Sequence, residues 1–325
     1  MLMTCRHFFF FFTDAACRQG TTVRDKCQRA CACRRGKLTD CHRVRKEFTQ
    51  LSKEEKRRYL YVVLIVSTKE PYKTKHEALL TKHKTFFGFN IHRATYFLPW
   101  HRWFLLQYEN LLREVDCRVT VPYWDWSLVS ASPFKNDFWE GTQGFGGNGV
   151  GFPPCVRTGP FRTTNNWKVA KSAGGGCLQR NFVPIPGIVP DVVAVAKVLA
   201  TNLTSFSDFE LMLRVNLHDV VHFAIGGTML TRDSAAAPEF FLHHAYVDRL
   251  WADWQAKSKR HRFHKFFLAQ NTKMPGTPLA SIDLLNNENL PGCVKVRYAL
   301  PGLANWDKLI EKLKVVAGKA ERVCV

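Results

Sequence analysis

The residues in this chain best able to do chemistry are histidines that fall into two groups. The first half of the sequence contributes His83, His92 and His101, and the second half contributes His218, His222 and His244. Three neutral imidazoles suit copper or zinc better than calcium or magnesium, which prefer oxygen ligands. Two all-histidine sites side by side favour copper acting together with dioxygen. We therefore expect two copper ions in one paired redox site.

The second group opens with two histidines on one predicted helical face. His218 and His222 are four residues apart, so both imidazoles can reach a single ion. Zinc proteases use the same spacing, but there a glutamate follows the first histidine and acts as the general base. Here Asp219 occupies that position. The sequence therefore disfavours a hydrolytic zinc site.

The same group closes with two adjacent histidines, only one of which can face the interior of a helical bundle. Neighbouring residues on a helix point about 100° apart. His244 precedes Val247 by three residues and Trp251 by seven, so it shares their apolar face. We expect His244 to be a metal ligand and His243 to lie behind the ligands.

Helices must position these side chains, and the chain carries several helix signals. A capping box at Ser52–Glu55 predicts a helix from about residue 53, and a second box at Ser207–Glu210 predicts one that ends near Gly226. Further helices are predicted over Lys75–Phe86, from Leu98 onwards with Pro99 in the first turn, and from Pro238 to Lys257.

The segment between the two histidine groups is irregular. Residues 141–176 contain ten of the twenty glycines of the chain, which predicts long loops in place of regular elements. The fold class we expect is mainly α, a four-helix bundle that holds a dinuclear copper site, with long irregular loops and minor strands. Bundle cores can place side chains from facing helices around a metal.

Cysteine usage indicates an oxidising, extracytoplasmic compartment. The chain has eleven cysteines, and six of them crowd into the first 41 residues as an apparent disulfide knot: Cys5, Cys17, Cys27, Cys31, Cys33 and Cys41. The phenylalanine run over residues 8–12 is shorter than the core of a secretory signal, so a signal peptide is not clearly present. No apolar run has the roughly 18 to 20 residues that a transmembrane helix needs.

The chain is strongly basic, with a formal net charge of +20. Such a charge attracts polyanions, and an acidic matrix polymer is one candidate partner. Much of the charge lies in two stretches, 18–58 and 257–265, and no recognisable nucleic-acid module accompanies them. We therefore expect no specific nucleic-acid partner.

Two segments of the chain resemble the copper signatures of the tyrosinase family. They are residues 92–102, HRATYFLPWHR, and residues 241–251, FLHHAYVDRLW; the segments PYWDW at 122–126 and GGTM at 226–229 are also similar. The resemblance implies a type 3 dicopper centre that binds dioxygen. It also implies oxidation of o-diphenols to o-quinones, and it leaves open whether monophenols are hydroxylated first. Phenolic or catecholic small molecules would be the substrates.

The resemblance also implies a domain division and a set of ligands. Residues 1–45 would form a cysteine-rich N-terminal segment, 46–290 the tyrosinase-like dicopper domain, and 291–325 a C-terminal segment packed on the core. The first copper ligands would be His83, His92 and His101, and the second His218, His222 and His244.

The first of these ligands has an alternative. Only nine residues separate His83 from His92, whereas family members usually have a longer loop there, and His76 with a spacing of sixteen fits that length. We favour His83 because it lies at the end of a predicted helix, as the first ligand of the family does.

Further positions extend the resemblance to the catalytic machinery. Glu210 resembles the glutamate that holds a water near the second copper, and Asp219 replaces the asparagine often found after the first histidine of the second group; both are candidate catalytic residues. Arg232 falls where relatives place a gating side chain. Asn90 stands where many relatives have a cysteine crosslinked to a ligand, so no crosslink is expected.

Two other function classes remain compatible with the histidine pattern. A haemocyanin-like carrier uses the same copper pair to bind dioxygen without turnover. A matrix protein with a degenerate site would bind no copper. A catechol assay on copper-loaded protein distinguishes these classes from an oxidase.

Overall fold

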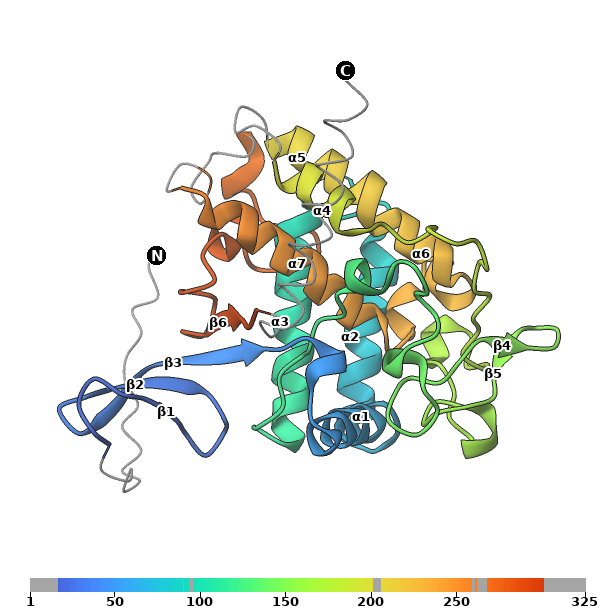
Figure 1. Cartoon of the computed structure of the whole chain (residues 1–325), viewed down its shortest axis with the longest axis horizontal. Helices are drawn as coiled ribbons and strands as arrows, with labels where there is room; N and C mark the ends of the chain where they lie inside the picture. Colours follow the sequence, from blue (N-terminus) through green and yellow to red (C-terminus); the bar gives the residue numbers. More distant parts are fainter. Residues whose placement is uncertain are drawn as a thin grey trace, which may run out of the picture.

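The computed structural model describes residues 17–89, 91–93, 96–200, 206–258, 261 and 268–300. Over these residues the protein is mainly helical, with few strands (Figure 1). This confirms the predicted fold class. Among the described helices, none is both long and apolar enough to cross a bilayer. The helices and their loops surround one extended apolar core.

The histidines are carried by a central group of helices. These are α2 (Tyr72–Phe86), α3 (Phe97–Val115), the continuous run of α5 (Phe206–Leu213), a π-helical turn (Arg214–His218) and α6 (Asp219–Ile225), and α7 (Phe240–Ala256). Helix α3 packs against both α2 and α7, so the two halves of the chain meet along it (Figure 1). The helices that carry the two histidine groups therefore form one bundle.

Helix α1 (Lys53–Thr68) covers α2 and α3 from outside. Its start is determined locally, because the Ser52 hydroxyl accepts from the Glu55 amide and the Glu55 carboxylate accepts from the Ser52 amide. This reciprocal cap satisfies two amides that would otherwise lack partners. The predicted start at residue 53 is confirmed.

Helix α3 is buried around almost its whole circumference. Trp100, Phe104 and Tyr108 are each 0% exposed, and even the polar Arg102 and Glu109 lie in the core. A helix that is buried on nearly all sides lies in the centre of the protein, and here Arg102 and Glu109 tolerate burial because each is paired with an opposite charge. This central position lets α3 present His101 to the histidines of α7.

The second predicted capping box is wrong. Helix α5 already includes Phe206, so Ser207 lies inside the helix and is not its N-cap. The run also contains a π-helical turn at Arg214–His218 before α6 ends at Ile225. Elsewhere the predicted bounds differ slightly, since α2 begins at Tyr72 and α7 at Phe240.

The remaining regular elements are short. A four-stranded sheet has the order β1 (Thr22–Arg24), β2 (Ala30–Arg34), β3 (Lys37–Arg45) and β6 (Lys295–Tyr298), and β4 (Gly149–Val150) pairs with β5 (Cys155–Val156). Helix α4 spans Val192–Leu199. Short 3-10 turns lie at Phe48–Gln50, Trp126–Val129, Asp137–Trp139, Thr163–Asn165, Lys171–Ala173, Gly227–Leu230, Ser234–Ala236, Leu268–Asn271 and Ser281–Leu284.

The disulfides differ from a self-contained N-terminal knot. Cys17–Cys33 and Cys31–Cys41 lie within the N-terminal segment, but Cys27 pairs with Cys117, just beyond the end of α3. Cys155–Cys177 closes part of the irregular segment. The N-terminal sheet is therefore fastened to the helical bundle. The phenylalanine run, Asn90 and residues 301–325 of the C-terminal segment lie outside the described residues.

Candidate dicopper site

The first histidine group comes together at the ends of two helices. His83 lies in the last turn of α2, His101 lies in the first turns of α3, and His92 lies in the connecting segment. One ring nitrogen from each histidine lies within 4.8 Å of the others. The Nε2 atoms of His83 and His92 are 3.0 Å apart. The connecting segment therefore folds back far enough for a spacing of nine residues to form a triad.

The alternative first ligand lies elsewhere. His76 is two turns earlier on α2, and its ring packs against Tyr108 with 5.9 Å between ring centroids. The structure groups His83, and not His76, with His92 and His101.

The second group converges from the π-helical turn, which carries His218, from α6, which carries His222, and from α7, which carries His244. The Nε2 atom of His244 lies 3.2 Å from that of His218 and 3.4 Å from that of His222. The ring of His244 also stacks on the ring of His101, with 4.3 Å between centroids and 12° between planes. The two groups therefore adjoin each other across the α3–α7 contact.

Backbone and carboxylate acceptors orient several of these rings. The Nδ1 atom of His92 donates to Phe87 O at 3.2 Å, and that of His101 donates to Phe97 O at 2.8 Å. The Nδ1 atom of His222 donates to Met229 O at 2.6 Å. In His218 the acceptor is Asp219 Oδ1, at 2.7 Å. Since these oxygens only accept, the proton is on Nδ1 and the lone pair is on Nε2. The tethered rings thus present donor atoms to a metal.

Burial keeps the imidazoles neutral. Removal from water lowers the pKa of His83, His101, His218 and His244 well below the ordinary histidine value, and neighbouring histidines lower it further. Burial lowers the pKa of His92 to about 4. Neutral imidazoles are the form that binds metal.

An unsatisfied ring nitrogen at the centre of the two histidine groups indicates a cation site. His101 Nε2 is buried without a hydrogen-bond partner, although buried polar atoms are nearly always satisfied. The Nε2 atoms of His218 and His222 carry lone pairs, and both lie within 3.4 Å of His244 Nε2, so the three nitrogens converge on a point where one cation can bind. Three imidazoles per ion suit copper. The residues fit a type 3 dicopper site with two histidine triads.

His243 lies closer to the second triad than expected. It is 0% exposed, its ring stacks on His218 at 5.1 Å, and a ring nitrogen belongs to the same 4.8 Å cluster. The Nε2 atoms of His218 and His222 nevertheless lie within hydrogen-bonding distance of His244 Nε2 and not of His243, which favours His244 as the third ligand.

The candidate catalytic carboxylates are joined by an arginine that sequence reasoning missed. Arg214 Nε donates to buried Glu210 Oε1 at 2.7 Å, and Arg214 Nη1 lies 3.7 Å from Asp219 Oδ2. Asp219 in turn accepts from His218. The only sequence signal for this arrangement is the four-residue spacing of Glu210 and Arg214, which is common on helices.

Arg232 lies beside the first triad. Its guanidinium is 5.9 Å from the centroid of the Phe87 ring, and that ring packs on His92 with 4.1 Å between centroids. An exposed cation thus stands near the histidine that is least buried of the six.

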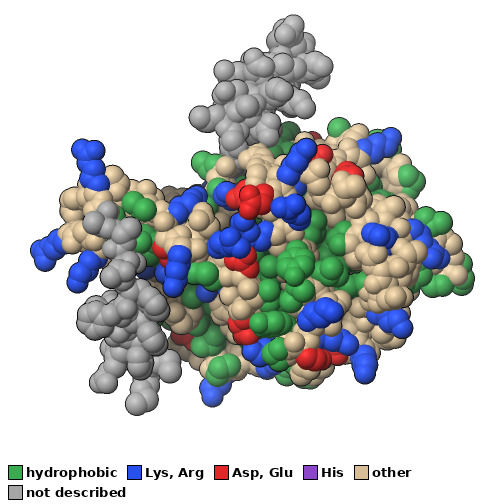
Figure 2. All heavy atoms as spheres, turned by 90° about the horizontal axis from the view of Figure 1, so that it is seen from below, with side chains coloured by type: hydrophobic (Ala, Val, Ile, Leu, Met, Phe, Trp, Pro, Cys, Tyr) green, Lys and Arg blue, Asp and Glu red, His purple; other side chains and the backbone are tan. Residues whose placement is uncertain are grey.

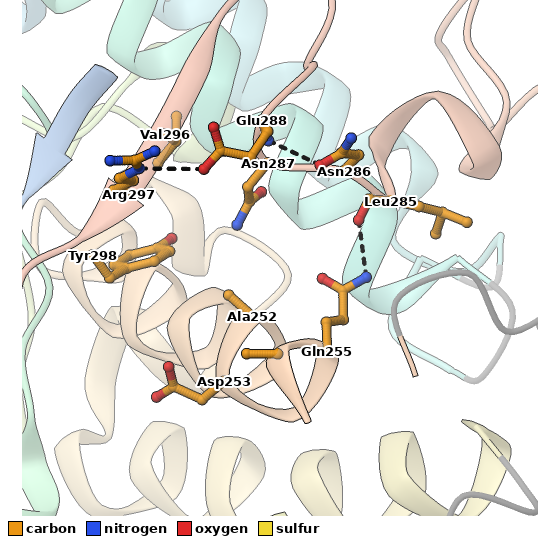
Figure 3. Close-up of a pocket in the computed structure, with 11 residues that line it drawn as sticks. Ala252, Asp253, Gln255, Leu285, Asn286, Asn287, Glu288, Val296, Arg297 and Tyr298 are labelled. Atoms are coloured by element: carbon orange, nitrogen blue, oxygen red, sulfur yellow. Dashed lines mark hydrogen bonds and ion pairs between the residues drawn. The ribbon is translucent and has the colours of Figure 1, made fainter. Parts of the chain in front are cut away.

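A separate polar hollow lies at the other end of α7. It is formed by Asp253 and Gln255 of α7, the loop through Glu288, and Arg297 and Tyr298 of β6 (Figure 3). An ion pair between Arg297 and Glu288 crosses its rim. None of the clustered histidines lines this hollow, so it is distinct from the metal site.

The chain is similar to known proteins in sequence and in fold. Residues 56–257 match the model of the common central domain of tyrosinase. The tyrosinase of Streptomyces antibioticus is 35% identical over 234 residues, which are 66% of this chain and 83% of that protein. A mutant polyphenol oxidase from Thermothelomyces thermophila superposes with a TM-score of 0.63 at 22% identity, covering 80% of this chain and 89% of that one. A functional unit of octopus haemocyanin superposes with a TM-score of 0.55 at 16% identity, covering 83% of this chain and 72% of that one. The two histidine triads, the matched central domain and the similarity to tyrosinases together establish that this chain belongs to the tyrosinase family.

Proposed function

We propose that the protein oxidises o-diphenols to o-quinones with dioxygen, and that it also hydroxylates monophenols. His83, His92 and His101 would hold one copper, and His218, His222 and His244 the other. The convergence of neutral, buried Nε2 atoms in two adjoining groups carries this proposal. When bound, copper supplies dioxygen binding and electron transfer. Two catechols and one dioxygen give two quinones and two waters.

The chain itself supplies orientation and proton transfer. Asp219 keeps the His218 ring turned towards the triad through the Nδ1 hydrogen bond. Glu210 and Asp219, held beside each other by Arg214, would position a water that accepts the phenol proton. This base matters most for monophenols, because a phenol must lose its proton before hydroxylation.

Arg232 would select among substrates. Its place beside Phe87 and His92 puts a positive charge at the first triad, where it would attract phenols that carry a carboxylate. The disulfides within the described residues favour an oxidising, extracytoplasmic location.

A dioxygen carrier is the second candidate, since the fold of octopus haemocyanin is similar. The relatives at about 35% identity favour the oxidase, because they are named tyrosinases. A carrier would bind dioxygen reversibly and leave catechol unchanged.

Catechol turnover by copper-loaded protein tests the proposal. We expect 4-methylcatechol to give its quinone with one dioxygen consumed per two quinones formed. The His101→Ala variant should lose this activity, and a matched His42→Gln variant, which alters a histidine paired with Glu288 outside the cluster, should retain it. Reversible dioxygen uptake without quinone would favour the carrier, and failure to bind copper would indicate a degenerate site.

A further inference from the structure

The N-terminal sheet ends in a tight turn that presents consecutive cations. Strands β2 and β3 pair in one register from Ala32 and Thr39 to Arg34 and Lys37. The two residues between Arg34 and Lys37 have positive φ angles, 53° at Arg35 and 71° at Gly36. Such two-residue turns match the twist of a hairpin. The side chains of Arg34, Arg35 and Lys37 are therefore displayed at one point of the surface.

A fourth cation joins this turn from the preceding segment. Gln19 Oε1 accepts from the Arg35 amide at 2.6 Å, and the Gly20 amide donates to Cys33 O at 3.2 Å. These bonds place Arg18 beside the turn. We call Arg18, Arg34, Arg35 and Lys37 the basic tip.

Disulfides hold the basic tip in place. Cys17–Cys33 lies one residue from Arg18 and one residue from Arg34, and Cys31–Cys41 crosslinks β2 and β3 below it. Figure 1 shows this sheet projecting away from the helical bundle. A preformed array of charges loses less conformational entropy on binding than a flexible one.

The basic tip is exposed and only partly neutralised. All four side chains are solvent-exposed, and the nearby carboxylate of Asp40 is shared between Arg34, at 3.2 Å, and Lys295, at 2.7 Å. The two cations lower the pKa of Asp40, Lys295 most strongly. Figure 2 shows Lys and Arg side chains gathered on this projecting end. The four cations therefore outnumber the one carboxylate paired with them, and that carboxylate is shared with Lys295.

We propose that the basic tip is a docking site for an acidic polysaccharide carrying sulfate or carboxylate groups. Guanidinium groups bind such oxyanions with two parallel hydrogen bonds. The large exposed hydrophobic side chains of the described residues all lie outside 17–46, so the tip lacks the apolar anchor on which protein partners depend. An extended polyanion needs no such anchor. This binding is independent of copper and of phenol oxidation.

Affinity chromatography and calorimetry on the full chain test the proposal. The probes are heparin for sulfates, polygalacturonate for carboxylates and poly-L-glutamate for acidic polypeptide. We expect a polysaccharide to bind in a salt-dependent way, and neutralisation of the tip to weaken it at least about tenfold at 0.15 M salt. The tip variant is Arg18→Gln, Arg34→Gln, Arg35→Asn and Lys37→Gln; asparagine tolerates the positive φ at residue 35.

A matched control removes the same charge elsewhere. Four exposed cations outside the tip are neutralised: Lys53→Gln, Arg57→Gln, Lys69→Gln and Lys168→Gln. This control should retain most of the affinity, and both variants should keep wild-type turnover of 4-methylcatechol. If the tip variant loses its disulfide pairing, Arg18→Gln with Lys37→Gln leaves the two turn residues intact. Equal losses in tip and control variants would overturn the proposal, as would tip-dependent binding that is tighter for poly-L-glutamate than for either polysaccharide.

Discussion

Arg102 Nε donates to Asp248 Oδ1 at 2.6 Å in the core, and this contact joins the helix that carries His101 to the helix that carries His244. Arg102 follows His101 directly, and Asp248 lies one turn after His244. The guanidinium also stacks over Trp251, 3.6 Å from the ring centroid. Two triads on different helices need a fixed separation, and this buried pair is placed to maintain it.

Removal of Asp248 should therefore destabilise the protein strongly. Asp248→Asn leaves Arg102 without its buried counter-charge, which typically costs about 3 to 5 kcal/mol, whereas Arg45 keeps its ion pair with buried Glu109. We expect the midpoint of thermal unfolding to fall by roughly 6 to 20 °C. The matched change Asp253→Asn alters a partly exposed aspartate on the same helix and should lower it far less. Equal effects of the two substitutions would contradict this role.

Glu109 should contribute stability that depends on pH. Burial alone raises the pKa of Glu109, but the charges of Arg45 and Arg43 outweigh it and lower the pKa to about 2. The stabilisation is therefore complete above the unfolded value of 4.5 and is lost as pH falls towards 2. It amounts to about 3 kcal/mol.

Denaturant unfolding of wild type and Glu109→Gln between pH 2 and 7 measures this contribution. The difference in unfolding free energy between the two proteins should be largest near pH 7 and shrink below pH 4.5. Glu54→Gln, which removes an exposed partner of Arg58, serves as the control and should show no such trend. A difference in unfolding free energy that grows as the pH falls would show that the ionised Glu109 carboxylate does not stabilise the fold.

Asp219 should control the affinity of the second copper. Its carboxylate fixes His218 through Nδ1, and loss of such an orienting group typically lowers metal affinity about 10- to 100-fold. Competition with a copper chelator should show this loss in Asp219→Leu for one of two ions. Asp191→Asn, at the N-cap of α4, replaces one good capping residue by another and should bind copper normally. Weakening of both ions alike would argue against a role confined to His218.

Arg232 should affect substrate charge preference and not turnover in general. In Arg232→Gln we expect KM for a carboxylated catechol such as 3,4-dihydroxybenzoate to rise about 3- to 5-fold, the size of one exposed charge interaction. KM for the neutral 4-methylcatechol should stay unchanged, and Arg232→Lys should restore most of the preference. A parallel rise for both substrates would place Arg232 in a structural role beside Phe87.

Local signals explain which parts of the fold were predictable. The start of α1 follows from hydrogen bonds among residues 52–55, and the choice of His244 follows from its register with Val247 and Trp251 on one helix. Ser207 has the same capping-box spacing as Ser52, but the N-cap predicted from it is wrong. There the helix already includes Phe206, whose side chain is buried against Trp254, so tertiary packing outweighs the capping preference.

Features that depend on tertiary contacts or on local helix irregularity were not predictable from the sequence. The pairing of Cys27 with Cys117 joins residues 90 positions apart, and cysteine spacing does not encode it. His92 reaches His83 because its ring packs on Phe87 and its Nδ1 donates to Phe87 O, so the short connection closes on itself. The π-helical turn that ends at His218 changes the helical phase between Glu210 and the triad, and a regular period does not predict it.

Copper content per chain in His83→Ala and His76→Ala is the most direct test of the dicopper assignment. Elemental analysis of copper-loaded protein should give two coppers in wild type and in His76→Ala, because His76 packs against Tyr108 away from the cluster. His83→Ala should retain one, since it removes a member of the first triad. Two coppers in His83→Ala together with one in His76→Ala would contradict the site described here.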